Sequence, residues 1–125
     1  MINFALIGAG RIGKMHARNI FTNTRSNLQY VYDVNEDFSN EVVKFSAASV
    51  AKSAEEAINN KDVNAVFIAS ATTTHTKYII QAAKAGKSVL CEKPIDLDIN
   101  KVNECYEVVK DLNVPIQIGF NRRFD

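Results

Sequence analysis

The amino-acid sequence alternates between two hydrophobic periodicities. Short apolar runs, typical of strands buried in a sheet, occupy six places: residues 2–7, 29–33, 48–51, 65–69, 88–91 and 116–118. Between them lie five segments whose apolar residues recur at helical spacing: residues 11–20, a segment after Asn35, another after Ser53, residues 76–85 and a segment after Asp98. This alternation predicts repeated βαβ units.

Polar residues mark where the predicted helices begin and end. Asn35 and Asp98 can cap two helices, Ser53 and Glu56 form a capping box for a third, and Gly86 suits a left-handed end. The apolar residues at helical spacing are expected to pack inward: Ile12, Met15 and Ile20 in the first helix, Phe38, Val42 and Phe45 in the second, and Val102, Tyr106 and Val109 in the last.

Repeated βαβ units restrict the topology. Each crossover between parallel strands is expected to be right-handed, which builds a parallel sheet with helices on both faces. Six strands match the two-halved dinucleotide-binding (Rossmann) fold with strand order 3-2-1-4-5-6. We therefore expect an α/β chain with a doubly wound parallel six-stranded sheet, forming one domain over residues 1–125.

Composition narrows the class of partner. Fifteen Lys and Arg residues against fourteen Asp and Glu residues give a formal net charge of +1, so no nucleic-acid or membrane-surface partner is expected. No apolar run reaches the ~18 residues of a membrane span, and the first ten residues lack the basic leader of a signal peptide. Cys91 and Cys105 show no metal-binding spacing, so we expect no metal, buried reduced thiols and a cytoplasmic protein.

A glycine-rich turn joins the first predicted strand to the first predicted helix. Residues 8–13 read GAGRIG and fit the GxGxxG pattern in the context that this pattern needs. Gly8 permits the tight turn, Gly10 lets a pyrophosphate approach the backbone, and Gly13 lets helix and strand pack closely. The free amides at the helix start then face the phosphates. The alternative is a glycine-rich turn that binds no ligand.

Asp33 lies twenty positions after Gly13, at the end of the second predicted strand. A carboxylate there can accept hydrogen bonds from both hydroxyls of an adenosine ribose, and it would repel a 2′-phosphate. No Arg or Lys follows within the next few residues to offset that repulsion. The expected cofactor is therefore NAD and not NADP. The alternative is a solvated carboxylate at a strand end.

Three further segments follow strands at the same expected edge of the sheet. Residues 70–75 could line a nicotinamide pocket or simply cap the next helix. Lys93 could orient a hydroxyl or shift a proton, or it could be a surface lysine. Residues 121–123 could contact the cofactor or a second domain, or remain solvated. His16 is interpreted as a packed histidine on the inner side of the first helix.

Together these motifs resemble the glucose–fructose oxidoreductase / inositol dehydrogenase family. The matching segments are residues 8–13, 15–17, Asp33, residues 71–75, 91–94 and 119–125. The resemblance covers the whole chain, and Glu92-Lys93-Pro94 after the fifth strand is its most specific part. Residues 91–96 and 119–125 look most like those of inositol 2-dehydrogenases.

The resemblance implies a reaction and a set of site residues. Lys93 would be the catalytic lysine in hydride transfer from a hydroxyl of a polyol or sugar, such as myo-inositol, to NAD. The bond before Pro94 would be cis. The implied cofactor-binding residues are Gly8, Gly10, Arg11, Ile12, Gly13, Asp33, Ala71, Thr72, His75, Glu92, Lys93 and Arg122.

Family members continue into a second α/β domain that carries a catalytic His and an Asp, and nothing in this sequence matches them. The resemblance therefore implies an N-terminal cofactor domain that binds NAD without turning over substrate alone, from an enzyme that is a homo-oligomer when whole. One alternative is a non-catalytic NAD sensor, against which Lys93 argues. Another is a Rossmann domain for a different adenosine ligand, against which the three glycines and Asp33 argue.

Overall fold

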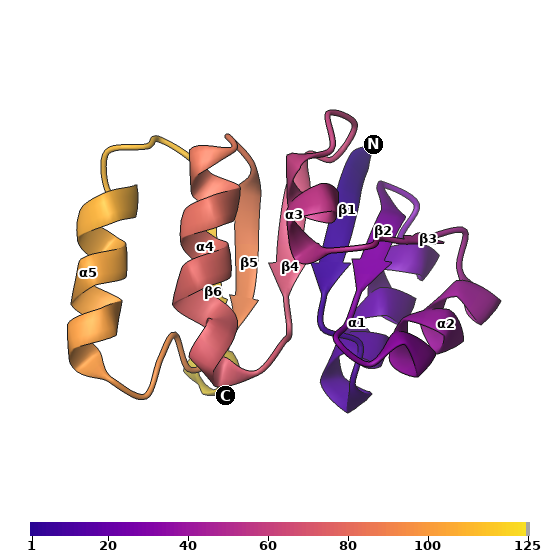
Figure 1. Ribbon diagram of the computed structural model, residues 1–125, viewed down its shortest axis with the longest axis horizontal. Helices are drawn as coiled ribbons and strands as arrows, with labels where there is room; N and C mark the ends of the chain where they lie inside the picture. The colour runs from indigo at the N-terminus through magenta and orange to yellow at the C-terminus, as the bar shows by residue number, and fades with distance from the viewer. Residues whose placement is uncertain (125) are drawn as a thin grey trace.

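A computed structural model describes residues 1–124 and contains the expected six-stranded parallel sheet (Figure 1). Its strand order is β3-β2-β1-β4-β5-β6, which confirms the predicted Rossmann topology. The strands are β1 (Ile2–Ile7), β2 (Ser26–Tyr32), β3 (Ser49–Val50), β4 (Ala65–Ile68), β5 (Ser88–Glu92) and β6 (Ile116–Gly119). All of the paired strands run parallel.

Helices cover both faces of the sheet and define two cores. They are α1 (Arg11–Thr22), α2 (Glu36–Phe45), α3 (Ala54–Asn59), α4 (His75–Lys84) and α5 (Ile99–Val109), with 3-10 turns η1 (Thr72–Thr74) and η2 (Asn121–Phe124). Along β1, Ala5 and Ile7 join the core under α3, α4 and α5, whereas Leu6 joins the core under α1 and α2. This alternation is the period of two that a strand buried on both faces requires.

The predicted caps are confirmed. The side chain of Asn35 accepts from the Asp37 N–H at 3.1 Å, and Asp98 accepts from the Asn100 N–H at 2.9 Å. Ser53 accepts from the Glu56 N–H at 3.0 Å. The Glu56 carboxylate reaches one residue further back than a capping box requires and accepts from the Lys52 N–H at 2.7 Å. Gly86, with φ of 75°, ends α4.

The inward faces of two helices differ from those predicted. In α1, Ile12 and Met15 are 46% and 47% exposed, and the buried residues are Gly13, Ala17 and Ile20. Gly13 and Ala17 let the first turns of this helix lie close to the sheet, where Ile12 and Met15 do not fit, and Ile20 packs inward as predicted. In α5, Tyr106 is 63% exposed, and its neighbour Cys105 is buried instead.

Three further differences concern α2 and the strands. Phe38 lies on the exposed side of α2, next to the buried Ser39, while Val42 faces the core as predicted. The second strand begins at Ser26 rather than at residue 29, because Ser26 pairs with Ile2. The third strand is limited to Ser49–Val50; the flanking Ala48 and Ala51 are buried, and the Ala51 N–H still donates to the Val31 carbonyl of β2 at 2.9 Å.

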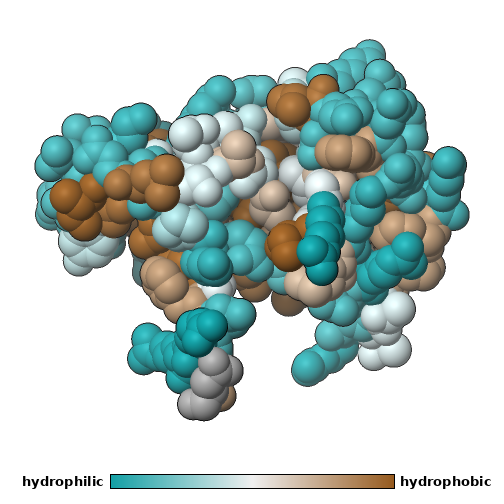
Figure 2. Space-filling model, turned by 90° about the horizontal axis from the view of Figure 1, so that it is seen from below, coloured by the Kyte–Doolittle hydropathy of each residue, from teal (hydrophilic) through white to brown (hydrophobic). Residues whose placement is uncertain are grey.

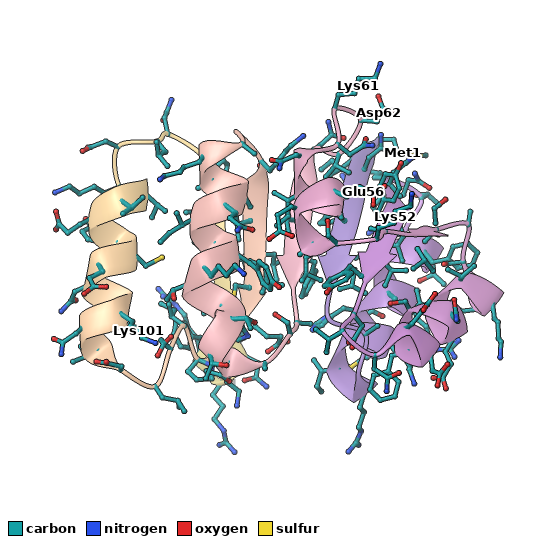
Figure 3. All side chains as sticks on the ribbon, viewed as in Figure 1. Met1, Lys52, Glu56, Lys61, Asp62 and Lys101 are labelled. Carbon is teal, nitrogen blue, oxygen red and sulfur yellow. The ribbon has the colours of Figure 1, made fainter. Side chains whose placement is uncertain are left out.

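The amino and carboxyl ends of the strands lie on opposite sides of the molecule. Met1, Lys61 and Asp62 lie at the amino end of the sheet (Figure 3), opposite the glycine-rich turn. Figure 2 views the molecule from the carboxyl end, where hydrophilic and apolar residues intermingle.

Among the helices of residues 1–124, none has the length and apolar character that crossing a membrane requires. The same residues hold no cluster of His, Cys, Asp and Glu suited to a metal ion.

Burial gives Cys91 a distinct expected effect on stability. Desolvation, followed by the nearby Glu92 charge, raises the pKa of this thiol from 9.0 to about 12. The folded state therefore keeps the proton between these values while the unfolded chain loses it. We expect Cys91 to reduce the free energy of unfolding as pH rises above 9, by about 1.4 kcal/mol per pH unit at most. Urea unfolding from pH 8 to 10 checks this, because Cys91→Ala should show a shallower pH dependence than the parent; equal slopes would contradict it.

Candidate functional site

Two neighbouring cavities open at the carboxyl ends of the strands. The Asp33 cavity, of about 260 Å³, is lined by residues that include Gly8, Gly10, Asp33, Ala71 and Tyr78. The Lys93 cavity, of about 440 Å³, is lined by residues that include Ile12, His16, Thr72, His75, Glu92, Lys93 and Asn121. Ala69 and Ser70 line both, so the cavities adjoin where β4 ends. The strand order reverses here, between β1 and β4, which is where ligands bind in such sheets.

A larger hollow, of about 850 Å³, lies elsewhere, against Met1, Phe4, Phe67 and Leu90. No Asp, Glu or Lys lines it. Arg25 and the amino terminus at Met1 bring positive charge to this hollow, but no carboxylate, lysine or glycine-rich turn accompanies them, so it has fewer converging functional groups than the two smaller cavities. We therefore place the candidate site at the carboxyl edge of the sheet.

The glycine-rich turn leaves no room for side chains at two of its glycines. Gly8 has φ of 98°, and a Cβ there would overlap the backbone of Ala69 and Ser70. A Cβ on Gly13 would overlap the carbonyl of Gly8, so α1 packs directly on the end of β1. At Gly10, by contrast, a Cβ would meet no atom within 4 Å. The turn is therefore closed toward the sheet and open at Gly10.

The start of α1 is suited to an anion. Gly10 provides no side-chain cap, and the first turn of the helix holds no acidic residue. The first backbone hydrogen bond of this helix runs from the Lys14 N–H to the Gly10 carbonyl at 2.8 Å. The N–H groups of residues 11–13 therefore have no acceptor within the helix. These amides and the positive end of the helix dipole favour a phosphate at this point.

Asp33 is held in place by the backbone. Its Oδ2 accepts from the Ala9 N–H at 2.7 Å, and its Oδ1 accepts from the Asn35 N–H at 2.8 Å. A carboxylate can accept roughly four hydrogen bonds, so acceptor sites remain for a ligand in the cavity that Asp33 lines. Residues 34–43 include Glu36, Asp37 and Glu41 and no Lys or Arg. The local charge therefore disfavours a 2′-phosphate.

Glu92 and His16 form a contact that the sequence did not reveal. His16 Nε2 lies 2.6 Å from Glu92 Oε1, and Glu92 Oε2 accepts from the Lys93 N–H at 3.2 Å. The His16 ring also packs on Phe67, with 4.2 Å between ring centroids. The interpretation of His16 as a packed residue is therefore correct but incomplete. The Lys93–Pro94 peptide bond is cis, as expected.

His75 is almost fully buried at the first residue of α4, with 1% of its surface exposed. Its Nδ1 lies 2.7 Å from the Pro94 carbonyl oxygen, and its Nε2 lies 2.9 Å from the Ser70 carbonyl oxygen. Beside it, the hydroxyls of Ser70 and Thr74 lie 2.7 Å apart. Both nitrogens of the ring thus face backbone carbonyls.

The structure brings most of the predicted site residues to the two cavities. Arg11 and Arg122 are exposed and line neither cavity, and Gly13 acts through packing. Asn121 lines the Lys93 cavity in place of Arg122. Tyr78 lines the Asp33 cavity, and burial raises the pKa of its hydroxyl. Tyr78 was not predicted as a site residue, because an aromatic residue on a helix is usually interpreted as part of the core.

Comparison with known proteins decides the family. Residues 2–120 match the family model of the Gfo/Idh/MocA oxidoreductases, described as having an NAD-binding Rossmann fold. The chain belongs to this oxidoreductase family. The expected family and its NAD-binding Rossmann fold are thereby confirmed.

Similar proteins are named as inositol dehydrogenases. An inositol 2-dehydrogenase of Rhizobium meliloti is 39% identical over 124 residues, covering 99% of this chain and 37% of that protein. A crystal structure of scyllo-inositol dehydrogenase from Lactobacillus casei, with bound cofactor NAD(H) and scyllo-inositol, has a TM-score of 0.93 at 35% identity. A myo-inositol dehydrogenase from Corynebacterium glutamicum has a TM-score of 0.92 at 38% identity. Each of these two matches covers 100% of this chain and 38% of the other protein's chain.

The residues present fit NAD. The open side of Gly10 and the uncapped start of α1 leave space and donors for a pyrophosphate. Asp33 lines the cavity on one side of this point with acceptor sites for a ribose, and the adjoining cavity holds Lys93. The family's cofactor and the geometry of the site therefore agree.

Proposed function

We propose that this chain is the NAD-binding domain of a dehydrogenase that oxidises a ring hydroxyl of a polyol or sugar, with myo-inositol as the first substrate to test. The observation that supports it best is Lys93, which lines the cavity next to the Asp33 cavity at the carboxyl edge. A lysine at this position can assist hydride transfer by holding the substrate hydroxyl, a role that a site which only senses NAD does not need. The names of the similar proteins support the substrate class.

Each group would have a defined task. The N–H groups of residues 11–13 and the open face of Gly10 would hold the pyrophosphate, and Asp33 would accept from the adenosine ribose. Bound NAD would supply the hydride acceptor. Lys93 would hydrogen-bond the substrate hydroxyl and the nicotinamide ribose, which orients the carbinol and helps its proton to leave. The remaining proposed cofactor contacts are Ile12, Ala71, Thr72, Glu92 and, reaching from outside the cavities, Arg11 and Arg122.

Turnover is proposed to need more than residues 1–125. The chain spans 37% of the length of the inositol 2-dehydrogenase that it matches. Within residues 1–124, the two imidazoles near Lys93 contact protein groups: His16 Nε2 contacts Glu92, and both nitrogens of His75 contact backbone carbonyls. We propose that a second domain supplies the missing groups and the surface through which the whole enzyme forms a cytoplasmic homo-oligomer.

The substrate proposal predicts a difference between this chain and a fusion. The chain alone should produce no NADH from NAD with myo-inositol or scyllo-inositol. Joined to the remainder of the Rhizobium meliloti relative, it should produce NADH, and Lys93→Met should lower kcat by about 100-fold or more. Lys101→Met, at an exposed position on α5 (Figure 3), is the matched control and should leave kcat unchanged. NADH formation by the chain alone, or full activity of the Lys93→Met fusion, would contradict the proposal.

A further inference from the structure

His75 joins the two segments that form the Lys93 cavity. It begins α4, directly after the η1 turn that contains Thr72. Pro94, whose carbonyl oxygen it contacts at 2.7 Å, is the residue after Lys93. Ser70, whose carbonyl oxygen lies 2.9 Å from His75 Nε2, follows β4 and lines both cavities. A single buried ring thus bridges the segment after β4 and the segment after β5.

The contacts of this ring leave it no polar atom for a ligand. An imidazole has two nitrogens, and a carbonyl oxygen can only accept a hydrogen bond. Both nitrogens of His75 face carbonyl oxygens, and 99% of the residue is shielded from solvent. Although His75 lines the Lys93 cavity, it can present only carbon atoms there.

We propose that His75 is a positioning residue, which holds the Lys93 segment in place through a hydrogen bond from Nδ1–H to the Pro94 carbonyl, and that it is not a cofactor ligand. This inference rests on the proposed role of Lys93. Losing the bond would let residues 92–96 shift relative to β4 while the Asp33 cavity stays intact. Affinity for NAD would fall only through the contact that Lys93 makes.

The tautomer of His75 gives the first test, with the unmodified chain and no cofactor. A neutral imidazole donates from one nitrogen only, so the tie to Pro94 requires a proton on Nδ1, in the neutral or the charged ring. Ring nitrogen chemical shifts in a ¹⁵N NMR spectrum should show Nδ1 protonated. A ring with a bare Nδ1 would overturn the proposal, whether or not the chain binds NAD.

Two amide variants separate the two contacts. His75→Asn places a donor where Nδ1 lies, and His75→Gln places one where Nε2 lies. We expect His75→Gln to shift the backbone amide resonances of residues 92–96 and to raise the Kd for NAD about tenfold, the usual cost of one lost hydrogen bond to a well-ordered segment. His75→Asn should leave both close to the parent values. Equal shifts of residues 92–96 in the two variants would overturn the proposal.

A double-mutant cycle tests whether His75 acts through Lys93. In a Lys93→Met background, the effect of His75→Gln on the Kd for NAD should shrink to less than about twofold, because the group being positioned is gone. An undiminished effect would mean that His75 contacts the cofactor itself or supports the whole site, and would overturn the proposal. If the parent chain binds no NAD, the proposed function fails, and the tautomer and amide resonances still decide the role of His75.

Discussion

Gly13→Ala is expected to lower the free energy of unfolding by about 3 kcal/mol or more. The added methyl group would overlap the carbonyl of Gly8, which is backbone and cannot rotate away as a flexible side chain would. Relieving the overlap would separate α1 from the end of β1, and Ala17 and Ile20 would lose part of their packing in the core under α1. Urea unfolding followed by circular dichroism measures the loss.

Gly10→Ala is the matched control for this prediction. A methyl group at Gly10 would meet no protein atom within 4 Å, so the free energy of unfolding should change by less than about 1 kcal/mol. The same methyl group would stand in the space proposed for the pyrophosphate, so affinity for NAD should still fall. Equal stability of the Gly13→Ala and Gly10→Ala variants would contradict the packing described at this turn.

Asp33→Ala is expected to weaken NAD binding by roughly 30- to 150-fold, which corresponds to about 2–3 kcal/mol for the loss of charge-assisted hydrogen bonds. The carboxylate is proposed to accept from both ribose hydroxyls, and alanine can accept from neither. Discrimination between NAD and NADP should fall at the same time, because the charge that repels a 2′-phosphate is removed. Calorimetric titration of the variant with each dinucleotide measures both effects.

Two controls separate the role of Asp33 in binding from its role in the fold. Asp33 also accepts from the Ala9 and Asn35 N–H groups, so its removal will lower stability, and thermal unfolding must show that the variant is folded at the titration temperature. Asp37→Ala removes the same charge from an exposed position in the first turn of α2 and should leave NAD affinity unchanged. An equal loss of affinity in both variants would argue against a direct contact between Asp33 and the ribose.

Local patterns were sufficient to predict the fold and the backbone of the site. The parallel sheet follows from six apolar runs and the handedness of their crossovers, and its strand order was predicted by matching six strands to the two-halved dinucleotide-binding fold. The roles of Gly8 and Gly13 follow from a local motif whose glycines lie where a side chain would clash with the backbone. The cis bond before Pro94 came instead from the resemblance to the family.

Features that depend on how distant segments meet were not predictable. The contact of His16 with Glu92 joins α1 to the end of β5, across 76 positions, and no local pattern encodes it. The buried ring of His75 was expected to contact the cofactor, and only the fold shows that the carbonyls of Ser70 and Pro94 occupy its nitrogens. Cys105 and Tyr106 are adjacent on α5 and point about 100° apart, and the packing of the helix on α4 and the sheet decides which of them is buried.

We propose that the carboxyl ends of the strands hold NAD through the glycine-rich turn and Asp33. Calorimetric titration of the unmodified chain with NAD and, separately, with NADP tests it most directly. We expect saturable binding of NAD and at least about tenfold weaker binding of NADP, because Asp33 and the lack of a cation in residues 34–43 disfavour a 2′-phosphate. Binding of neither dinucleotide, or equal affinity for both, would contradict it.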